Sequence, residues 1–278
     1  MKIALVGYGK MGHMIEQAAL GLGHSVVTTI DVFSEDAKVK IAAGDTKAMV
    51  DAIVASGAEG IIEFTHPASV LDNIKALLPT KLPLVVGTTG WNDKKDEVAA
   101  LAASCGGTIM TSANFSIGVN VFYKIVEEAC RLVDHFEEYD AALWEMHHNQ
   151  KADSPSGTAL DLAKHAMEFL SRKDTIVTNE FKARPKPNEF HVSSTRCGSV
   201  PGTHKIFFDS AADTIELTHT ARSRQGFASG AVHAVINLKE LLDEGKLIAG
   251  KLYGMAWQEI FLRHAKKQGI HHQIRPFQ

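Results

Sequence analysis

The chain opens with the stretch KIALVGYGKMG, residues 2–12, in which a short apolar run meets a cluster of glycines. Residues 3–6 are typical of a parallel strand that is buried on both faces. Gly7, Gly9 and Gly12 follow at the G-x-G-x-x-G spacing, which provides a tight turn, a close backbone approach and a close helix–sheet contact. A helix that begins just after the second glycine points its free N–H groups at a bound pyrophosphate. The stretch therefore predicts a dinucleotide-binding fold.

A glycine triplet is a weak signal by itself, and its context strengthens it here. A second apolar run, residues 26–30, ends at Asp31, about 20 residues after the glycines, where this fold uses an acid to bind the adenosine ribose hydroxyls. The alternative is a generic strand–turn–helix with incidental glycines, which does not account for the placement of that acid.

Composition excludes several classes of protein. The chain has 278 residues, of which 45% are hydrophobic and 22% charged, as in a globular protein of one large or two ordinary domains. Its formal net charge of -3 gives no basic field for nucleic acid. No apolar stretch approaches the roughly 20 residues that span a bilayer, and we expect no signal peptide before the first strand. The 3 cysteines are widely spaced without a C-x-x-C pair, which favours a cytoplasmic protein without disulfides.

Strand and helix signals alternate over the first part of the chain. We expect strands at 60–64, 82–86 and 108–111, and helices at 67–78 and from about 92 to 104. Pro67 is placed in the first turn of one helix, and Asn92 or Asp93 caps the other. This alternation predicts a Rossmann-like, doubly wound parallel sheet, with ligands beyond the carboxyl ends of its strands.

The alternation changes after residue 116. Helices are expected at 117–133, 154–170 and 228–242, and a strand at 141–146. Residues 190–193, 205–208 and 214–218 are expected to be antiparallel strands, with a turn-rich segment at 196–204. The prediction is a second α+β domain with a mixed or antiparallel sheet.

Polar residues are densest in EMHHNQKADSPSGT, residues 145–158. Ser154 and Pro155 suit the N-cap and first position of a helix, which leaves Gly157 and Thr158 to offer backbone N–H groups to a carboxylate or phosphate. Two histidines and a lysine lie just upstream and can supply a proton near neutral pH and a positive charge. The segment therefore suits the binding and protonation of an acidic small molecule.

Other interpretations of this segment stay open. In isolation, a histidine pair is more often a pair of ordinary surface or hydrogen-bonded side chains, and the serine–proline pair is typical of a simple helix cap. Histidine pairs also bind zinc, but the sequence has no H-E-x-x-H pattern and no third ligand at a suitable spacing. We therefore predict no metal site.

Five segments together resemble the 4-hydroxy-tetrahydrodipicolinate reductase family, also called dihydrodipicolinate reductases. They are VGYGKMG at 6–12, GTTG at 87–90, ANFS at 113–116, EMHHNQK at 145–151 and SPSGTA at 154–159. The resemblance runs in order along nearly the whole chain, and the histidine–lysine segment is specific to the family. The chain departs from the family pattern at Met146, where alanine is common, and in the 196–204 segment.

The resemblance implies an NAD(P)H-dependent reduction, with loss of water, of 4-hydroxy-tetrahydrodipicolinate in lysine and diaminopimelate biosynthesis. It implies a dinucleotide-binding domain of residues 1–115 and 223–278, a substrate-binding and oligomerisation domain of residues 116–222, and a homotetramer. By matching motif, His147 is the general acid and Lys151 the second catalytic cation. Substrate contacts fall to His148, Gly157, Thr158 and Thr89. Cofactor contacts fall to Gly7, Tyr8, Gly9, Lys10, Met11, Gly12, Asp31, Phe64, Thr65, Gly87, Thr88, Thr89, Ala113, Asn114 and Phe115.

The choice between NADH and NADPH rests on Asp31. Its carboxylate suits free ribose hydroxyls and repels a 2′-phosphate, and Val32 supplies no neighbouring cation. Lys38 and Lys40 are the cations nearest in sequence. We predict that NADH is used at least as well as NADPH. The alternatives to this reductase are another two-domain NAD(P)-dependent oxidoreductase, acting on a sugar or an aspartate-derived aldehyde, and an inactive dinucleotide-binding sensor.

Overall fold

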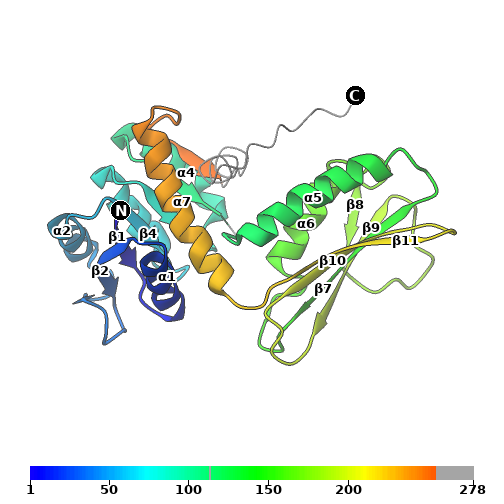
Figure 1. Ribbon diagram of the computed structural model, residues 1–278, viewed down its shortest axis with the longest axis horizontal. Coiled ribbons are helices and arrows are strands. Elements are labelled where there is room, and N and C mark those ends of the chain that lie inside the picture. Colours follow the sequence, from blue (N-terminus) through cyan, green and yellow to red (C-terminus); the bar gives the residue numbers. More distant parts are fainter. Residues whose placement is uncertain (113, 255–278) are drawn as a thin grey trace. The chain divides into compact units, whose positions relative to one another are not determined.

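The computed structural model describes residues 1–112 and 114–254. It divides the chain into two compact units, residues 1–115 with 228–278 and residues 116–227 (Figure 1). The boundary expected at residue 223 falls just before the helix that leads back into the first unit. No helix in the described part of the chain has the length and apolarity to cross a membrane.

The first unit contains a parallel sheet of seven strands in the order β12-β6-β5-β4-β1-β2-β3. Every pairing in it is parallel, as the alternating sequence pattern predicted. Its strands are β1 Lys2–Val6, β2 Ser25–Asp31, β3 Val39–Lys40, β4 Gly60–Glu63, β5 Leu84–Val86, β6 Ile109–Thr111 and β12 Leu252–Gly254. This arrangement confirms the Rossmann-like fold.

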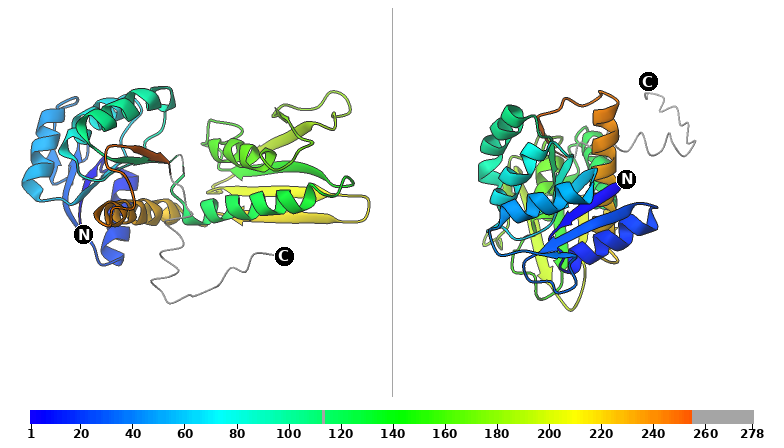
Figure 2. Two further views of the ribbon diagram at one scale, coloured as in Figure 1. Left: turned by 90° about the horizontal axis from the view of Figure 1, so that it is seen from above. Right: turned by 90° about the vertical axis from the view of Figure 1, so that its left-hand side faces the viewer.

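Helices cover both faces of this sheet. They are α1 Lys10–Gly21, α2 Thr46–Ser56, α3 Val70–Leu77, α4 Lys95–Cys105 and α7 Gln225–Asp243, with the 3₁₀ turns η1 Leu78–Thr80 and η2 Asn92–Lys94. Strand alternation sends Ile3 and Leu5 into a core with α1 and α7, and Ala4 and Val6 into a core with α2, α3 and α4. Figure 2 shows α7, in orange, and α4 on opposite sides of the sheet.

Two local expectations in the first unit were wrong, and one helix was missed. The helix expected from Pro67 begins at Val70, because the His66 carbonyl accepts hydrogen bonds from Ser69 and Val70 and closes a turn first. Neither Asn92 nor Asp93 caps a helix, since they form η2 and α4 begins after it without a side-chain cap. Helix α2, which was not predicted, starts at Asp45, whose carboxylate accepts a hydrogen bond from the Ala48 N–H at 3.0 Å.

The second unit contains a mixed sheet of five strands in the order β11-β10-β7-β9-β8. The strands are β7 Asp140–His147, β8 Thr175–Val177, β9 Glu189–Arg196, β10 Thr203–Asp209 and β11 Thr214–Thr220. β10 pairs antiparallel with β7 and β11, as expected, but β9 pairs parallel with β7. The expectation of an antiparallel strand at 190–193 was therefore wrong, because helix α6 provides the crossover that parallel neighbours need.

Helices α5 Ile117–Val133 and α6 Gly157–Met167 cover one face of this mixed sheet (Figure 1). Residues of the two helices form a core with alternate residues of β7, β9 and β10, among them Leu143, Phe190 and Phe208. The intervening residues, such as Trp144 and Phe207, lie on the other face and are only half-buried. The side of the sheet that carries alternate residues 141, 143, 145 and 147 therefore faces the helices.

Candidate active site

The glycine turn after β1 has the shape that a pyrophosphate site requires. Gly7 has a φ of +93°, and a Cβ there would lie 2.0 Å from the Phe64 carbonyl oxygen. A Cβ at Gly12 would lie 2.4 Å from the Gly7 carbonyl oxygen, so α1 packs tightly on the turn. Nothing lies within 4 Å of a Cβ at Gly9, the uncapped N-cap of α1, and Lys10 and Met11 begin the helix. The turn therefore fits a dinucleotide phosphate at the helix N-terminus.

Asp31 ends β2 beside that turn. Its carboxylate accepts hydrogen bonds from the N–H groups of Tyr8 at 2.6 Å, Phe33 at 2.7 Å and Ser34 at 2.9 Å. Burial acts to raise the Asp31 pKa, but these backbone donors outweigh it and hold the pKa below its usual range. The side chain is thus a charged acceptor beside the turn, where the sequence predicted an acid for the ribose.

The ends of β4 and β5 meet at the same edge of the sheet. The Phe64 N–H donates to the Val6 carbonyl at 2.8 Å, and the Thr65 N–H donates to the Thr88 hydroxyl at 2.7 Å. A Cβ at Gly87 would overlap the Phe64 ring. The structure therefore brings together the glycine turn and four further residues that were predicted to line the cofactor, Phe64, Thr65, Gly87 and Thr88.

The remaining predicted cofactor residues lie in different surroundings. Thr89 is exposed beside the buried Thr88. Asn114 and Phe115 are buried, and Phe115 belongs to the core, with its ring centroid 6.2 Å from that of Phe64. Ala113 lies outside the described residues.

In the second unit, strand alternation and register assemble a polar cluster at the end of β7. Glu145 and His147 are two residues apart and point to the helix-covered face. The register places Arg196 of β9 opposite His147, and His204 of β10 opposite Glu145. Neighbours across a sheet lie on the same face, so four side chains from three strands meet there.

The Glu145 carboxylate is the centre of this cluster. It is 0% exposed, it is hydrogen-bonded to His147 Nδ1, and its Oε1 lies 2.8 Å from Arg196 Nη2. The Ser156 N–H also donates to Oε1, at 3.2 Å. Burial acts to raise the Glu145 pKa, but the hydrogen bonds from His147 and Arg196 lower it to about 2. Glu145 is therefore ionised at neutral pH.

His204 and Gly202 complete the surroundings of His147. Burial, followed by repulsion from His147, lowers the pKa of His204 to about 3, so this ring is neutral. The two rings meet edge-on with centroids 5.2 Å apart. A Cβ at Gly202 would lie 2.8 Å from His147 Nε2. One potential metal-ligating atom from each of Glu145, His147 and His204 lies within 4.8 Å of the others. Both Glu145 oxygens, however, already accept hydrogen bonds or pair with His147, Arg196 and Ser156. We therefore interpret the cluster as a hydrogen-bonded network and not as a metal site.

Helix α6 begins differently from the prediction. Ser154 and Pro155 lie before the helix, joined by a cis peptide bond, and Ser156 is the N-cap, accepting a hydrogen bond from the Ala159 N–H at 3.1 Å. The error moves the cap by two residues, because the capping oxygen must reach an N–H three residues on. Gly157 and Thr158 are still the first two helical residues, as a carboxylate site requires.

This helix start already holds a carboxylate. The Lys151 ammonium lies 2.8 Å from the Asp153 carboxylate, which also accepts a hydrogen bond from the Gly157 N–H. Burial acts to raise the Asp153 pKa, but the Lys151 hydrogen bond is the strongest of the contacts that lower it. Half-buried His148 is next to them, and its carbonyl accepts a hydrogen bond from the Lys151 N–H at 3.1 Å. The cation and the helix N-terminus can therefore share one carboxylate.

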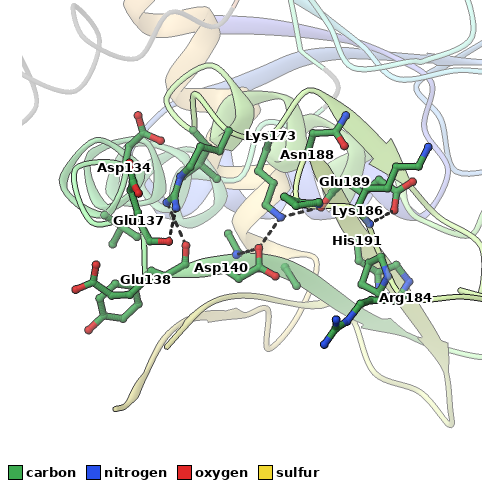
Figure 3. A pocket seen from close by; sticks show the side chains of 18 of the residues that line it. Asp134, Glu137, Glu138, Asp140, Lys173, Arg184, Lys186, Asn188, Glu189 and His191 are labelled. Atoms are coloured by element: carbon green, nitrogen blue, oxygen red, sulfur yellow. Dashed lines mark hydrogen bonds and ion pairs between the residues drawn. The ribbon is translucent and has the colours of Figure 1, made fainter. Parts of the chain in front are cut away.

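A cavity of about 1010 Å³ lies at the opposite end of β7, around Asp140. Figure 3 shows the Lys173 side chain pointing toward Asp140 and Glu189. Lys173 Nζ lies 2.5 Å from the Asp140 carboxylate and donates to the Glu189 carbonyl at 2.9 Å. None of the predicted site residues lines this cavity. The polar cluster at the carboxyl end of β7 is therefore separate from this cavity.

The comparison with known families matches both units. The family described as "Dihydrodipicolinate reductase, N-terminus" matches residues 1–115, and "Dihydrodipicolinate reductase, C-terminus" matches residues 118–256. The chain belongs to the dihydrodipicolinate reductase family. This confirms the resemblance inferred from the five sequence segments, and it makes the chain a nicotinamide-dinucleotide-dependent oxidoreductase.

Relatives within the dihydrodipicolinate reductase family cover most of the chain. A 4-hydroxy-tetrahydrodipicolinate reductase from Christiangramia forsetii is 35% identical over 240 residues, which is 86% of this chain and 93% of that protein. One from Archaeoglobus fulgidus is 36% identical over 242 residues, 84% of this chain and 92% of that protein. The solved dipicolinate-bound dihydrodipicolinate reductase from Paenisporosarcina shares the fold at a TM-score of 0.69 and 21% identity, covering 91% of this chain and 97% of that one.

Four residues of the polar cluster at the end of β7 were not among the predicted site residues. They are Glu145, Arg196, Gly202 and His204. Alternation along β7 could have nominated Glu145, because it lies two residues before His147. The other three lie in or beside the segment 196–204, which was expected to be one turn. Its ends instead belong to β9 and β10, and only the strand register brings them to His147.

Proposed function

We propose that this chain catalyses the NAD(P)H-dependent reduction of 4-hydroxy-tetrahydrodipicolinate, with loss of water, to tetrahydrodipicolinate in lysine and diaminopimelate biosynthesis. The membership of both units in the dihydrodipicolinate reductase family carries this proposal. The pairing of a histidine with a buried carboxylate, close in sequence to a lysine that binds a carboxylate, supports it.

His147 is the proton donor in this proposal. Loss of water from the substrate leaves a conjugated imine, which needs a hydride and a proton to become the product. The nicotinamide cofactor, when bound, supplies the hydride. The protonated imidazole of His147 gives up the proton from Nε2, while its Nδ1 stays hydrogen-bonded to Glu145. Lys151 adds a positive charge that stabilises negative charge as it develops on the ring.

The substrate carries two carboxylates, and the α6 N-terminus suits one of them. Lys151 and the Gly157 N–H already share the Asp153 carboxylate, so the same groups can accept a substrate carboxylate in its place. Thr158 and His148 lie beside them and supply further donors. In the first unit, the predicted cofactor residues would bind the dinucleotide, and Thr89 would lie between the cofactor and the substrate.

The two units take different roles in this proposal. Residues 1–115 with 223–278 bind the dinucleotide, and residues 116–222 bind the substrate and form the oligomer. The half-buried outer face of the mixed sheet, with Trp144 and Phe207, supports a homotetramer built through the second unit. Cys105, Cys130 and Cys197 are free, which supports a cytoplasmic location. Lys38 and Lys40 are already hydrogen-bonded, to the Val26 carbonyl and to Glu35, which supports use of NADH at least as well as NADPH.

The decisive experiment follows the absorbance of the reduced cofactor while aspartate semialdehyde and pyruvate are condensed enzymatically in the same cuvette. We expect the cofactor to be oxidised only when the condensing enzyme and this protein are both present. His147→Gln and Lys151→Ala should each lower kcat by on the order of 10²- to 10⁴-fold while the dissociation constant of NADH stays nearly unchanged. Absence of turnover with both cofactors would overturn the proposed reaction, and near-wild-type kcat in either variant would remove that residue's role.

A further inference from the structure

The contacts of the buried, ionised Glu145 carboxylate point to a role beyond the stability of the fold. Removing a carboxylate from water costs several kcal/mol unless cations and hydrogen bonds compensate. Glu145 is compensated by Arg196 at 2.8 Å and the Ser156 N–H at 3.2 Å, both on Oε1. Those two contacts leave the other oxygen, Oε2, to His147 Nδ1.

An ionised carboxylate can only accept hydrogen bonds, and this decides where the His147 ring carries its protons. Because Glu145 is ionised, Nδ1 must be the donor in the hydrogen bond between them. The neutral ring therefore bears its proton on Nδ1, and the second proton of the charged ring is on Nε2. The proton that can be released to a substrate is then the one on Nε2.

The neighbours of Nε2 agree with this assignment. Residue 202 has a φ of +150° and, as a glycine, leaves open the space beside Nε2 that a Cβ would fill at 2.8 Å. His204 on β10 is neutral and hydrogen-bonds through its own Nε2 to the Ser156 hydroxyl at 3.3 Å. Arg196 on β9 pairs with Glu145, and the other titratable groups that act on His204 are Lys151, in the loop after β7, and His219 on β11. None of these groups hydrogen-bonds to Nε2 in the described part of the chain.

We propose that Glu145 is a positioning residue for the proton donor. It holds Nδ1 of His147, fixes the tautomer and ring orientation, and thereby presents Nε2 as the atom that delivers the proton, while Arg196 keeps Glu145 charged. This inference rests on the proposed reductase function for its catalytic consequence. Its structural content, the tautomer of His147, is independent of that function.

The first measurement needs no variant and no turnover. In the full-length protein labelled with ¹⁵N-histidine, NMR of the His147 ring nitrogens at a pH where the ring is neutral should show the proton on Nδ1. A neutral ring protonated on Nε2 would overturn the proposal. If the tautomer is as expected but no reductase activity is found, the proposed function fails and the positioning role of Glu145 stands.

The second measurement compares Glu145→Gln with Glu127→Gln. Glu127 is also buried, on α5, but it pairs with Lys124 and His165 away from this cluster. We expect Glu145→Gln to lower kcat by on the order of 10²-fold at nearly unchanged KM for NADH, because its neutral amide no longer fixes the proton on Nδ1. The negative charge beside the ring is also lost, so the pH–rate profile of the variant should differ from that of the wild type.

Glu145→Asp keeps the carboxylate and should recover part of the lost kcat, whereas Glu127→Gln should leave kcat and the pH profile unchanged. A Glu145→Gln enzyme with wild-type kcat and an unmoved pH profile would overturn the proposal even where the wild-type turns over normally. Should this variant fail to fold, Glu145→Asp and the tautomer of the unaltered protein still decide the question.

Discussion

Glu63 and Glu145 are both 0% exposed, and each lies near the carboxyl end of a strand in its own unit. Their pKa values are nevertheless shifted in opposite directions. Glu63 is surrounded by neutral partners, the Thr65 hydroxyl and the Asn73 amide at 3.2 Å, and burial raises its pKa. Glu145 has the same burial, but Arg196 and His147 lower its pKa to about 2. The comparison shows that burial alone does not set the charge of a carboxyl group, because its hydrogen-bond partners decide the direction of the pKa shift.

This difference fits the tasks of the two strand ends. Glu63 accepts hydrogen bonds from the Thr65 hydroxyl and the Asn73 amide, and neither partner requires it to be charged. Glu145 orients a titrating ring, where a fixed negative charge is needed. The following predictions test this contrast.

Removal of the cation beside Glu145 should give the largest effect. Arg196→Met leaves a buried carboxylate without its arginine partner, and we expect the unfolding free energy of the second unit to fall by about 3–5 kcal/mol at pH 7. Urea unfolding followed by the fluorescence of Trp144, which lies in β7, measures it. Lys164→Met is the matched control, because Lys164 and Asp161 form an exposed pair at 3.8 Å and should cost less than about 1 kcal/mol. Equal costs would show that Glu145 does not depend on its cation.

The same pair has a signature in pH. The folded-state pKa of Glu145 is lowered from 4.5 to about 2, so its stabilising contribution is complete above pH 4.5 and is lost as the pH falls toward 2. In Arg196→Met the folded-state pKa of Glu145 should lie closer to 4.5, so less stability should be lost between pH 4.5 and 2, which urea unfolding at several pH values in that range would detect. An unchanged acid transition would contradict the assigned role of Arg196.

The next largest effect is expected at Gly202, which leaves space beside His147 Nε2. Gly202→Ala should lower kcat by on the order of 10²-fold, because the new methyl group lies where the proton donor must be approached. Gly198→Ala is the control in the same loop. Gly198 has a φ of +53° and nothing within 4 Å of a Cβ, so that variant adds backbone strain without blocking the ring. Equal kcat in the two variants would attribute the loss to strain alone.

Asp31 is a third carboxylate, half-buried, that accepts hydrogen bonds from backbone N–H groups and, among the described residues, does not pair with a cation. Asp31→Ala should shift the ratio of kcat/KM for NADPH over NADH upward by about 10-fold, because the charge that repels a 2′-phosphate is removed. Steady-state kinetics with both cofactors measures it. Asp36→Ala removes an exposed carboxylate that binds His13 and should leave the ratio unchanged. A wild-type enzyme that strongly prefers NADPH would contradict the premise.

Local signals in the sequence predicted the cofactor residues of the first unit better than the network around Glu145 in the second unit. The glycine turn, Asp31 and the strand ends at 64–65 and 87–88 come from short motifs, and the structure brings them to one sheet edge. The helix at 117–133 was also predicted with its observed bounds. Contacts within a few residues are encoded locally, so a motif is sufficient to find them.

The network around Glu145 depends on pairings that no local pattern contains. Arg196 reaches His147, and His204 reaches Glu145, only through the register of β7 with β9 and β10. The parallel pairing of β9 follows from the crossover through α6 and reverses the antiparallel expectation. A one-residue change in register would turn every one of these side chains to the other face, so the network is a tertiary property.

Glu63→Gln should give the smallest effect, and it tests the neutral side of the comparison. A carboxyl group with a raised folded-state pKa stabilises the fold below its unfolded pKa, and the stability it gives is lost as the pH rises. Glutamine resembles the protonated acid at every pH. The variant should therefore lie within about 1 kcal/mol of wild type at pH 5 and become the more stable of the two as the pH rises.

Urea unfolding of both proteins from pH 5 to 9 measures this difference, with Glu59→Gln as the control. Glu59 is exposed and accepts a hydrogen bond from the Lys2 N–H at 2.7 Å, which lowers its pKa, so its glutamine variant should not gain on wild type at high pH. If Glu63→Gln instead lost stability at neutral pH, then Glu63 would be charged. The choice of hydrogen-bond partners would then not explain the charges of the two buried carboxyl groups.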